Sequence, residues 1–277
     1  MEQENIQTVI DGKGSCPAIV RASRVEDVVA NAAQNKQLRL NVNQQSAVET
    51  ILSSEDRIVG LQGGAGTGKT TTLSVLREVA ENECYQVRGF APTTRAAQQL
   101  AESGIETETL QKFLRRRQQP ATDKRLFVVD ESSLASTNQL NRFFARLDPT
   151  DKVLLVGDVR QHQAVEAGSP FEQLQQHGMT TAKLSEIVRQ RDPELKQTVE
   201  KLSSRQIREA VAELDSRGKV IEIADERDAS KRWPKTTARV PLTRSSFRQP
   251  IANASASTRL YTASFSTKEK SAVPSNR

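Results

Sequence analysis

Short apolar runs alternate with amphipathic stretches along the chain from about residue 40 onward. Such nearly continuous apolar runs are typical of strands that are buried on both faces of a sheet. We expect four of these strands, at Ile58–Leu61, Gln86–Ala91, Leu126–Val129 and Val153–Val156. Helices are expected at Asn43–Leu52, Thr70–Glu81, Arg95–Ser103, Thr109–Arg116, Leu134–Leu147 and Pro170–Gln176. The alternation predicts an α/β fold, a parallel sheet with helices on both faces, whose ligands collect at the carboxyl ends of the strands.

The pattern divides the chain into four regions. Residues 1–36 show helical spacing only around Arg24–Ala33, and residues 37–190 carry the strand–helix alternation. Residues 191–228 are predicted to be the helical start of a further region, which ends in a short strand at Lys219–Ile223. Residues 229–277 contain 15 serines or threonines and four prolines without a sustained period, so we expect this tail to be disordered.

The net charge of +6 at first suggests a nucleic-acid-binding protein, but its distribution removes that argument. From Ala229 to the C-terminus there are ten lysines or arginines and one acidic residue, a balance of +9. The rest of the chain then holds 30 basic and 33 acidic residues, a balance of −3. The basic excess lies in the tail, so it is no evidence that the folded part binds DNA.

Cysteine, histidine and hydropathy exclude several classes of protein. The two cysteines, Cys16 and Cys84, are far apart and lack metal-ligand spacing, so they read as reduced thiols. Two histidines are too few for a multi-histidine metal site. No apolar run approaches the ~20 residues of a membrane span, and the acidic N-terminus does not resemble a secretory signal. We therefore expect a cytoplasmic protein without membrane insertion.

A complete phosphate-binding motif, G-x-x-x-x-G-K-[ST], follows the first predicted strand and opens a predicted helix. Its glycines allow backbone N–H groups to surround a phosphate, and the helix N-terminus adds positive potential. Lys69 would reach the β- and γ-phosphates, and the Thr70 hydroxyl would ligate Mg²⁺. The alternative is a merely glycine-rich turn, which the strand before the motif and the helix after it disfavour. The nucleotide-binding residues are therefore Gly63, Gly64, Ala65, Gly66, Thr67, Gly68, Lys69, Thr70 and Thr71.

An Asp-Glu pair ends the third predicted strand, about 60 residues after the phosphate-binding lysine. Asp130 would hold Mg²⁺, and Glu131 would orient and deprotonate the water that attacks the γ-phosphate. Two carboxylates are needed because the metal occupies one of them. Alone, such a pair after a strand is common by chance, and the upstream phosphate loop makes the functional interpretation the better one.

Two glutamines are weaker candidates. Gln161 follows the Gly157-Asp158 end of the fourth predicted strand and could sense the γ-phosphate, although an ordinary strand-end turn explains the pattern as well. Gln44 precedes the phosphate loop by about 20 residues, and its amide suits the donor and acceptor edge of adenine. Taken alone, a glutamine on a helix is a surface residue.

The order of the motifs resembles that of superfamily 1 DNA helicases of the RecD-like type, in particular the helicase half of conjugative relaxase-helicases (TraI/TrwC-like). The resemblance covers roughly Leu40–Asp228 and rests on LNVNQQSAV, GLQGGAGTGKTTTL, GFAPTTRAAQQL, TLQKFL, VVDESSL, LVGDVRQHQAV and LSEIVRQRD. It implies a RecA-like ATPase domain that uses ATP and Mg²⁺, and single-stranded DNA and the conjugation machinery as partners.

The resemblance also assigns roles to individual residues. It implies that Gln44 contacts adenine and that Lys69, Asp130, Glu131 and Gln161 act as above. Arg189 would stabilise the charge that develops on the γ-phosphate, although by itself it reads as a solvated helix arginine. The groove for single-stranded DNA would be lined by Thr93, Thr94, Arg95, Gln111 and Phe113, and Phe113 could equally be a core residue.

The later motifs of such helicases are missing from this sequence. No T-x-H-x-x-Q-G-like segment or final arginine motif follows Gln190, and no histidine-rich relaxase module precedes the phosphate loop. Shifted by one reading frame, Ser245–Ala252 is compatible with Val-Val-Ser-Pro-Thr-Asn-Arg, which resembles a segment expected here. We therefore hypothesise a truncated helicase with a frameshifted tail from about Ala229, which the coding DNA would test.

Three functions remain open at this point. The first is an ATP-driven helicase motor domain, which is incomplete and unable to unwind DNA alone. The second is a small-molecule kinase, disfavoured by the Asp-Glu pair and the Gly-Asp-x-x-Gln segment. The third is a non-enzymatic fragment that binds ATP and single-stranded DNA. Stimulation of ATP hydrolysis by single-stranded DNA would distinguish the first from the third.

Overall fold

A computed structural model describes residues 1–116, 123–159, 169–185, 198, 201–202 and 206–218 of the chain. The chain divides into two units, Met1–Lys196 and Gln197–Arg277. The first unit contains the whole sheet, and the second contributes one described helix, α10 (Ile207–Ser216), within the region predicted to be helical. The strand expected at Lys219–Ile223 and the tail expected to be disordered lie outside the described residues.

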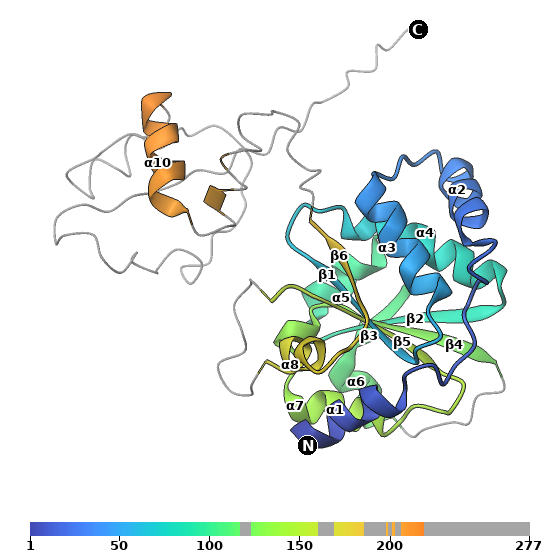
Figure 1. The fold of residues 1–277 in the computed structure, drawn as a ribbon. Helices are drawn as coiled ribbons and strands as arrows, with labels where there is room; N and C mark the ends of the chain where they lie inside the picture. The colour runs from blue at the N-terminus through green and yellow to red at the C-terminus, as the bar shows by residue number, and fades with distance from the viewer. Residues whose placement is uncertain (117–122, 160–168, 186–197, 199–200, 203–205, 219–277) are drawn as a thin grey trace, which may run out of the picture. The chain divides into compact units, whose positions relative to one another are not determined.

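Six parallel strands form one sheet in the order β3-β2-β4-β5-β1-β6 (Figure 1). The four predicted strands are all present, each extended by one or two residues. Two further strands were not predicted, because β3 has the polar sequence ETET and β6 is only four residues long. The strands are β1 (Ile58–Gly63), β2 (Tyr85–Ala91), β3 (Glu106–Thr109), β4 (Lys124–Val129), β5 (Lys152–Gly157) and β6 (Thr181–Leu184).

Helices cover both faces of the sheet, as the sequence predicted (Figure 1). The side chains of each central strand alternate between two apolar cores, so that Val59 faces one core and Ile58 the other. The first face carries α2 (Val25–Asn35), α3 (Val42–Ser53), α4 (Lys69–Asn82) and α5 (Thr94–Ala101). The second face carries α1 (Glu2–Asp11), α6 (Leu110–Arg115), α7 (Thr137–Phe144) and α8 (Pro170–Gln176).

The N-terminal segment is packed onto the same unit as the sheet. Helix α1 lies against α7 and α8, and the buried Asn5 donates its side-chain amide to the Thr137 carbonyl oxygen at 3.0 Å. Helix α2 packs on α3 and α4 through residues such as Val29, which is completely buried. Residues 1–36 therefore add one helix to each face of the sheet.

Helix α7 is shorter than the predicted Leu134–Leu147, and local capping gives the reason. The Ser136 hydroxyl accepts from the backbone N–H of Gln139, whose side chain accepts from the backbone N–H of Ser136. This capping box starts the helix at Thr137. Upstream of it, Ser132–Leu134 form a separate 3₁₀ turn.

Among the described helices, none is long and apolar enough to cross a bilayer.

Candidate nucleotide-binding site

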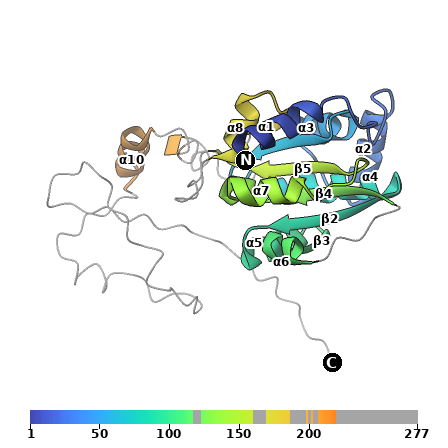
Figure 2. The same cartoon turned by 90° about the horizontal axis from the view of Figure 1, so that it is seen from below.

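Four polar loops meet at the carboxyl edge of the sheet because all the strands run in the same direction. The phosphate loop follows β1, and the segment beginning at Thr93 follows β2. Asp130 follows β4 and Asp158 follows β5. Figure 2 shows β5, β4, β2 and β3 side by side in this order. The fold thus brings to one edge residues that are far apart in the sequence: Gly63 and Asp158 are separated by 95 positions.

The phosphate loop has the backbone conformation that its glycines permit. Gly66 and Gly68 both have φ of 81°, in the left-handed region that side chains disfavour. Gly68 is the N-cap of α4, so the free N–H groups of the first turn of α4 point into the loop. Thr67 Oγ1 donates to the Gly64 carbonyl at 2.9 Å and stabilises the turn.

Lys69 is folded over this loop, since its Nζ donates to the Gly63 carbonyl oxygen at 3.0 Å. Thr70, the next residue, is exposed at the start of α4. A positive Nζ, free backbone N–H groups and a hydroxyl are the groups that a nucleotide triphosphate requires. The residues predicted to cradle the phosphates are therefore neighbours in one loop, and their contact with a nucleotide stays a prediction.

Gln44 connects α3 to the phosphate loop. Its Oε1 accepts from the backbone N–H of Asn41 at 3.0 Å, within a capping box that starts the helix. Its Nε2 donates to the Thr67 carbonyl at 3.3 Å, and the residue is 3 % exposed. The amide therefore has structural partners on both of its polar atoms, and its contact with adenine stays a prediction.

The two predicted carboxylates are in different surroundings. Burial raises the pKa of Asp130, while the nearby Lys69 charge and the Glu131 backbone N–H, which donates to Asp130 Oδ1 at 2.8 Å, oppose that rise. Burial and then the neighbouring Asp130 charge raise the pKa of Glu131, against the charges of Lys69 and Arg95. A raised pKa makes Glu131 a better proton acceptor than an ordinary glutamate.

Glu131 has a backbone conformation that is rare for a residue with a side chain, with φ of 50°. Residues held in this region are frequent at functional sites. The turn that imposes it is fixed to the next strand, because Ser132 Oγ donates to the Val156 carbonyl at 2.8 Å. Ser133 Oγ also accepts from the backbone N–H of Asp158 at 3.1 Å. The carboxylates thus lie on a rigid turn between β4 and β5.

Asp158 was not among the predicted site residues, although it ends a predicted strand. Its carboxylate lies against the phosphate loop, because a Cβ added to Gly64 would lie 3.3 Å from Asp158 Oδ2. Asp158 is 7 % exposed. The Gly-Asp pair at a strand end was the only sequence signal, and the parallel pairing of β5 with β1 decides that it faces the loop.

The donor set fits a magnesium ion that arrives with the nucleotide. Asp130 offers carboxylate oxygens and Thr70 an exposed hydroxyl, and hard oxygen ligands suit Mg²⁺. Among the described residues, no group of three or more histidine, cysteine or acidic side chains forms a metal site by itself. Magnesium sites of this kind take most of their remaining ligands from phosphate and water.

The residues assigned to DNA lie after β2 and around α6. Thr93 accepts from the Ala96 backbone N–H and caps α5, and Thr94, Arg95 and Gln111 are exposed. Phe113 is half-buried, and its ring centroid lies 4.5 Å from that of Phe90. Phe113 thus packs on the aromatic core of the second face, while its contact with DNA remains a prediction.

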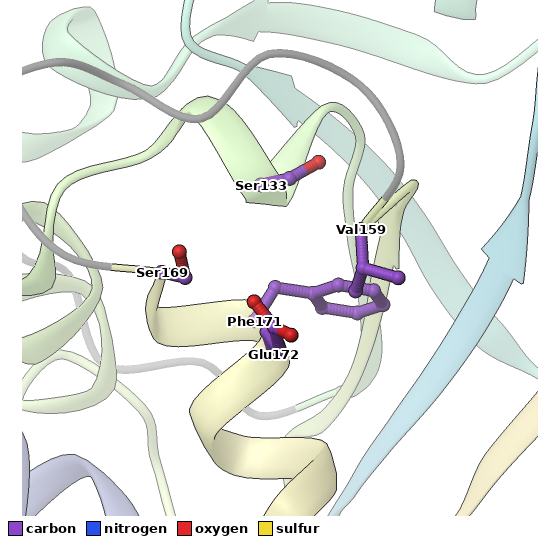
Figure 3. A pocket seen from close by; sticks show the side chains of 5 residues that line it. All are labelled: Ser133, Val159, Ser169, Phe171 and Glu172. Atoms are coloured by element: carbon purple, nitrogen blue, oxygen red, sulfur yellow. The ribbon is translucent and has the colours of Figure 1, made fainter. Parts of the chain in front are cut away.

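Two predicted residues, Gln161 and Arg189, lie outside the described residues. A separate hollow lies just beyond β5 (Figure 3). Among the described residues that line it, the one charged side chain is that of Glu172. Its lining residues are Ser133, Val159, Ser169, Phe171 and Glu172.

Comparison with known families gives one matching model, described as an AAA domain (AAA_30), over residues 39–225. The match therefore includes the phosphate loop, the Asp-Glu pair and the described part of the second unit. It begins after α2, so α1 and α2 lie outside the matched range.

Curated relatives share about a third of their aligned residues with this chain. Multifunctional conjugation protein TraI of Escherichia coli K12 is 33% identical over 191 residues, which are 64% of this chain and 11% of that protein. The probable conjugal transfer protein TraA of Sinorhizobium fredii is 35% identical, covering 61% of this chain and 16% of its own length. The ATP-dependent RecD2 DNA helicase of Deinococcus radiodurans is 32% identical, covering 56% and 23%.

Among solved structures, the Pif1 helicase of Candida albicans is similar with a TM-score of 0.46 and 20% identity. That match covers 60% of this chain and 44% of the helicase. The chain spans between about a tenth and a quarter of the length of the curated relatives named above.

Proposed function

The chain belongs to the AAA domain family, and on that premise we propose that it is the ATP-binding and ATP-hydrolysing motor domain of a DNA helicase of the conjugative relaxase-helicase type. The observation that carries the proposal is the meeting of the phosphate loop with the Asp130-Glu131 turn at one edge of the sheet. Lys69 acts electrostatically on Asp130 and on Glu131, so the phosphate-binding cation and both carboxylates share one site.

In this proposal each residue has one task. Lys69 leaves the Gly63 carbonyl and binds the β- and γ-phosphates, whose charge it neutralises. Thr70 and Asp130 would hold Mg²⁺, which would supply further charge neutralisation at the phosphates. Glu131 orients the attacking water and accepts its proton, for which a raised pKa is suited. Gln161 and Arg189 would complete the γ-phosphate site, as the resemblance implies.

Single-stranded DNA is the proposed partner of the α5 edge. Thr93, Thr94 and Arg95 stand at the start of α5, where hydroxyls, a guanidinium and the helix N-terminus suit a phosphate backbone. The relatives named for conjugation extend the proposal to the conjugation machinery. A non-enzymatic fragment that binds ATP and single-stranded DNA is the alternative function.

We further propose that these 277 residues do not separate DNA strands by themselves. Unwinding by helicases of this type needs a second RecA-like domain that moves against the first across the nucleotide. The described residues contain one such sheet. A displacement assay with a forked duplex tests this part, and robust ATP-dependent unwinding by the purified chain would refute it.

Calorimetry and phosphate release test the nucleotide part. We expect Mg-ATP to bind wild type, and Lys69→Ala to lose at least tenfold in affinity because a charge against two phosphates is removed. The matched control is Lys13→Ala, an exposed lysine outside the site. Equal affinity in Lys69→Ala would refute the site. Phosphate release that single-stranded DNA stimulates and that Glu131→Gln abolishes would support the ATP-hydrolysing motor domain. Binding of ATP and DNA without any phosphate release would support the non-enzymatic fragment.

A further inference from the structure

Helix α6 begins beside the proposed DNA edge. It follows β3, whose last residue Thr109 is paired with Ala91 at the end of β2. Helix α5 follows β2, so α5 and α6 begin at neighbouring ends of parallel strands (Figure 2). A single strand of DNA that extends from the start of α5 towards the β3 side of this edge therefore meets α6.

The two sides of α6 differ in chemistry. The side that packs on the sheet is apolar, because Leu110 and Leu114 are buried and the Phe113 ring lies 4.5 Å from that of Phe90. The opposite side is polar, and its exposed side chains stand at positions that share one side of a helix. These residues are Gln111, Lys112 and Arg115. An amide and two cations suit the phosphates of a nucleic acid.

One acidic residue lies close to this outer side. The Glu108 carboxylate is 3.8 Å from Lys112 Nζ and 3.3 Å from Arg116 Nη1, so it is shared between two cations. The Glu108 side chain is 8% accessible, whereas that of Lys112 is 63% accessible. The carboxylate therefore leaves a positive excess on the exposed surface of α6.

Helix α6 is too short to hold this surface in place by itself. It has six residues, and a helix of this length is not stable through its own hydrogen bonds. Its start is capped by Thr109, whose Oγ1 accepts from the Lys112 backbone N–H at 3.3 Å. Its last carbonyl groups have no partner within a regular helix, so they need donors from another part of the chain.

Arg146, in the turn after α7, supplies these donors. Its Nη1 donates to the Phe113 carbonyl at 2.7 Å and to the Arg116 carbonyl at 2.8 Å. Its Nη2 donates to the Leu114 carbonyl at 2.6 Å. The guanidinium carbon also lies 5.6 Å from the centroid of the Phe113 ring. A planar guanidinium that joins three carbonyls at a helix C-terminus, where positive charge is favourable, fixes both the position and the rotation of α6.

The outer side chains of α6 point where its backbone directs them. Without the three bonds from Arg146, the last turn would unwind, and Arg115 lies in that turn. We propose that Arg146 is a positioning residue for nucleic-acid binding, which holds the outer side of α6 in place as a phosphate-binding surface beside the start of α5. The inference rests on the proposed function and names a residue on which its DNA part depends.

Hydrogen exchange tests the positioning without any ligand. In the full 277-residue chain, Arg146→Gln removes the guanidinium fork. The backbone N–H groups of residues 114–116 should then exchange at least tenfold faster than in wild type, because the end of α6 frays. Arg142→Gln is the matched control, since it removes an exposed arginine on α7, and it should leave this exchange within about twofold of wild type. Unchanged exchange in Arg146→Gln would overturn the inference.

A double-mutant cycle tests whether Arg146 acts on DNA binding through α6. We would titrate a fluorescein-labelled oligo-dT at one fixed salt concentration with wild type, Arg146→Gln, the paired variant Lys112→Gln/Arg115→Gln, and the triple variant. Arg146→Gln should weaken binding about threefold or more in wild type and less than about 1.5-fold in the paired variant, whose α6 cations are already gone. An equal loss in both backgrounds would show that Arg146 acts on DNA independently of α6, which would overturn the inference.

Further measurements separate this inference from a folding defect and from the proposed function. Arg146→Gln should retain the Mg-ATP affinity of wild type and a cooperative urea transition. If it does not fold, Arg146→Lys replaces it in both experiments, because an ammonium lacks the planar fork that spans three carbonyls. An equal loss in both backgrounds, in a chain that binds ATP and DNA, would leave the proposed function standing. Absence of DNA binding by wild type would overturn both the inference and the DNA part of the proposed function.

Discussion

The Gln44 side-chain amide and the Thr67 carbonyl oxygen are joined by a hydrogen bond of 3.3 Å, which attaches the first turn of α3 to the phosphate loop. The same amide closes the capping box of α3 through the backbone N–H of Asn41. One buried side chain thus holds both a helix start and the loop that would bind phosphate. This relationship is tertiary, because Gln44 and Thr67 are 23 positions apart.

We expect Gln44→Ala to lower the free energy of unfolding by about 1–2 kcal/mol, since a capping interaction and a buried hydrogen bond are lost together. Urea denaturation followed by circular dichroism measures this loss. Gln45→Ala is the matched control, because Gln45 lies on the same helix and, among the described residues, its side chain bonds Glu49 alone. It should cost less than about 0.5 kcal/mol. Equal costs for the two variants would contradict the prediction.

The same variant separates loop positioning from adenine recognition. If the remaining N–H of Gln44 contacts adenine, as the resemblance implies, Gln44→Ala should lose more affinity for ATP than for GTP. Calorimetric titration with both nucleotides gives the ratio. A parallel loss for both nucleotides would leave Gln44 as a residue that positions the phosphate loop and nothing more.

Burial of Asp130 predicts a stability gain that depends on pH. Because the folded-state pKa is raised, the favourable contribution of this group is complete below the ordinary aspartate value of 3.8 and is lost as pH rises through the folded pKa. Asp130→Asn removes the ionisation, so it should be more stable than wild type at pH 8, by on the order of 1 kcal/mol. Near pH 4.5 the stability advantage of Asp130→Asn over wild type should shrink. Urea denaturation at both pH values measures it, and an advantage of equal size at both would contradict the prediction.

The positive φ of Glu131 makes a further prediction about stability. Glu131→Ala and Glu131→Gly both remove the carboxylate, but only glycine adopts a φ of 50° without a steric cost. We expect the glycine variant to be more stable than the alanine variant by about 1 kcal/mol, the usual cost of the left-handed region for a residue with a Cβ. Parallel urea denaturation of the two variants tests this, and a more stable alanine variant would show that the turn relaxes.

The largest loss of folding stability among these variants is expected in an ion-pair network at the amino end of the sheet. Arg125 Nε donates to Asp151 Oδ1 at 2.7 Å, and Nη2 also pairs with Asp148. Asp151 is completely buried, so Arg125→Ala leaves a buried charge without its cation and should cost about 3–5 kcal/mol.

Arg88→Ala provides the comparison for Arg125. Arg88 pairs at 3.3 Å with Glu106, which is 74% accessible, and at 4.0 Å with Glu108, which also pairs with Arg116. Arg88→Ala should therefore cost less than about 1 kcal/mol. Thermal and urea denaturation of both variants give the comparison. Similar small losses would mean that Asp151 finds other donors, for instance the Asp148 backbone N–H, which already donates to it.

Local pattern was sufficient wherever a residue's neighbours in sequence determine its structure. The phosphate loop was identified because its glycines and lysine act within one turn, and α8 was predicted with the correct bounds because Pro170 begins it. Strand β3 was missed because it is a polar edge strand, which has no apolar period for a sequence pattern to detect. The length of α7 depended on a local capping box that the predicted range overlooked.

The contacts between distant segments were decided only by the tertiary structure. That Asp158 faces Gly64, that Gln44 holds Thr67, and that the Arg95 charge reaches Glu131 all depend on which strands are neighbours. The order β3-β2-β4-β5-β1-β6 is a property of the packed sheet, and no window of sequence records it. The sequence by itself determined which chemical groups stand at strand ends, and packing of the apolar strands determined which of those ends share a site.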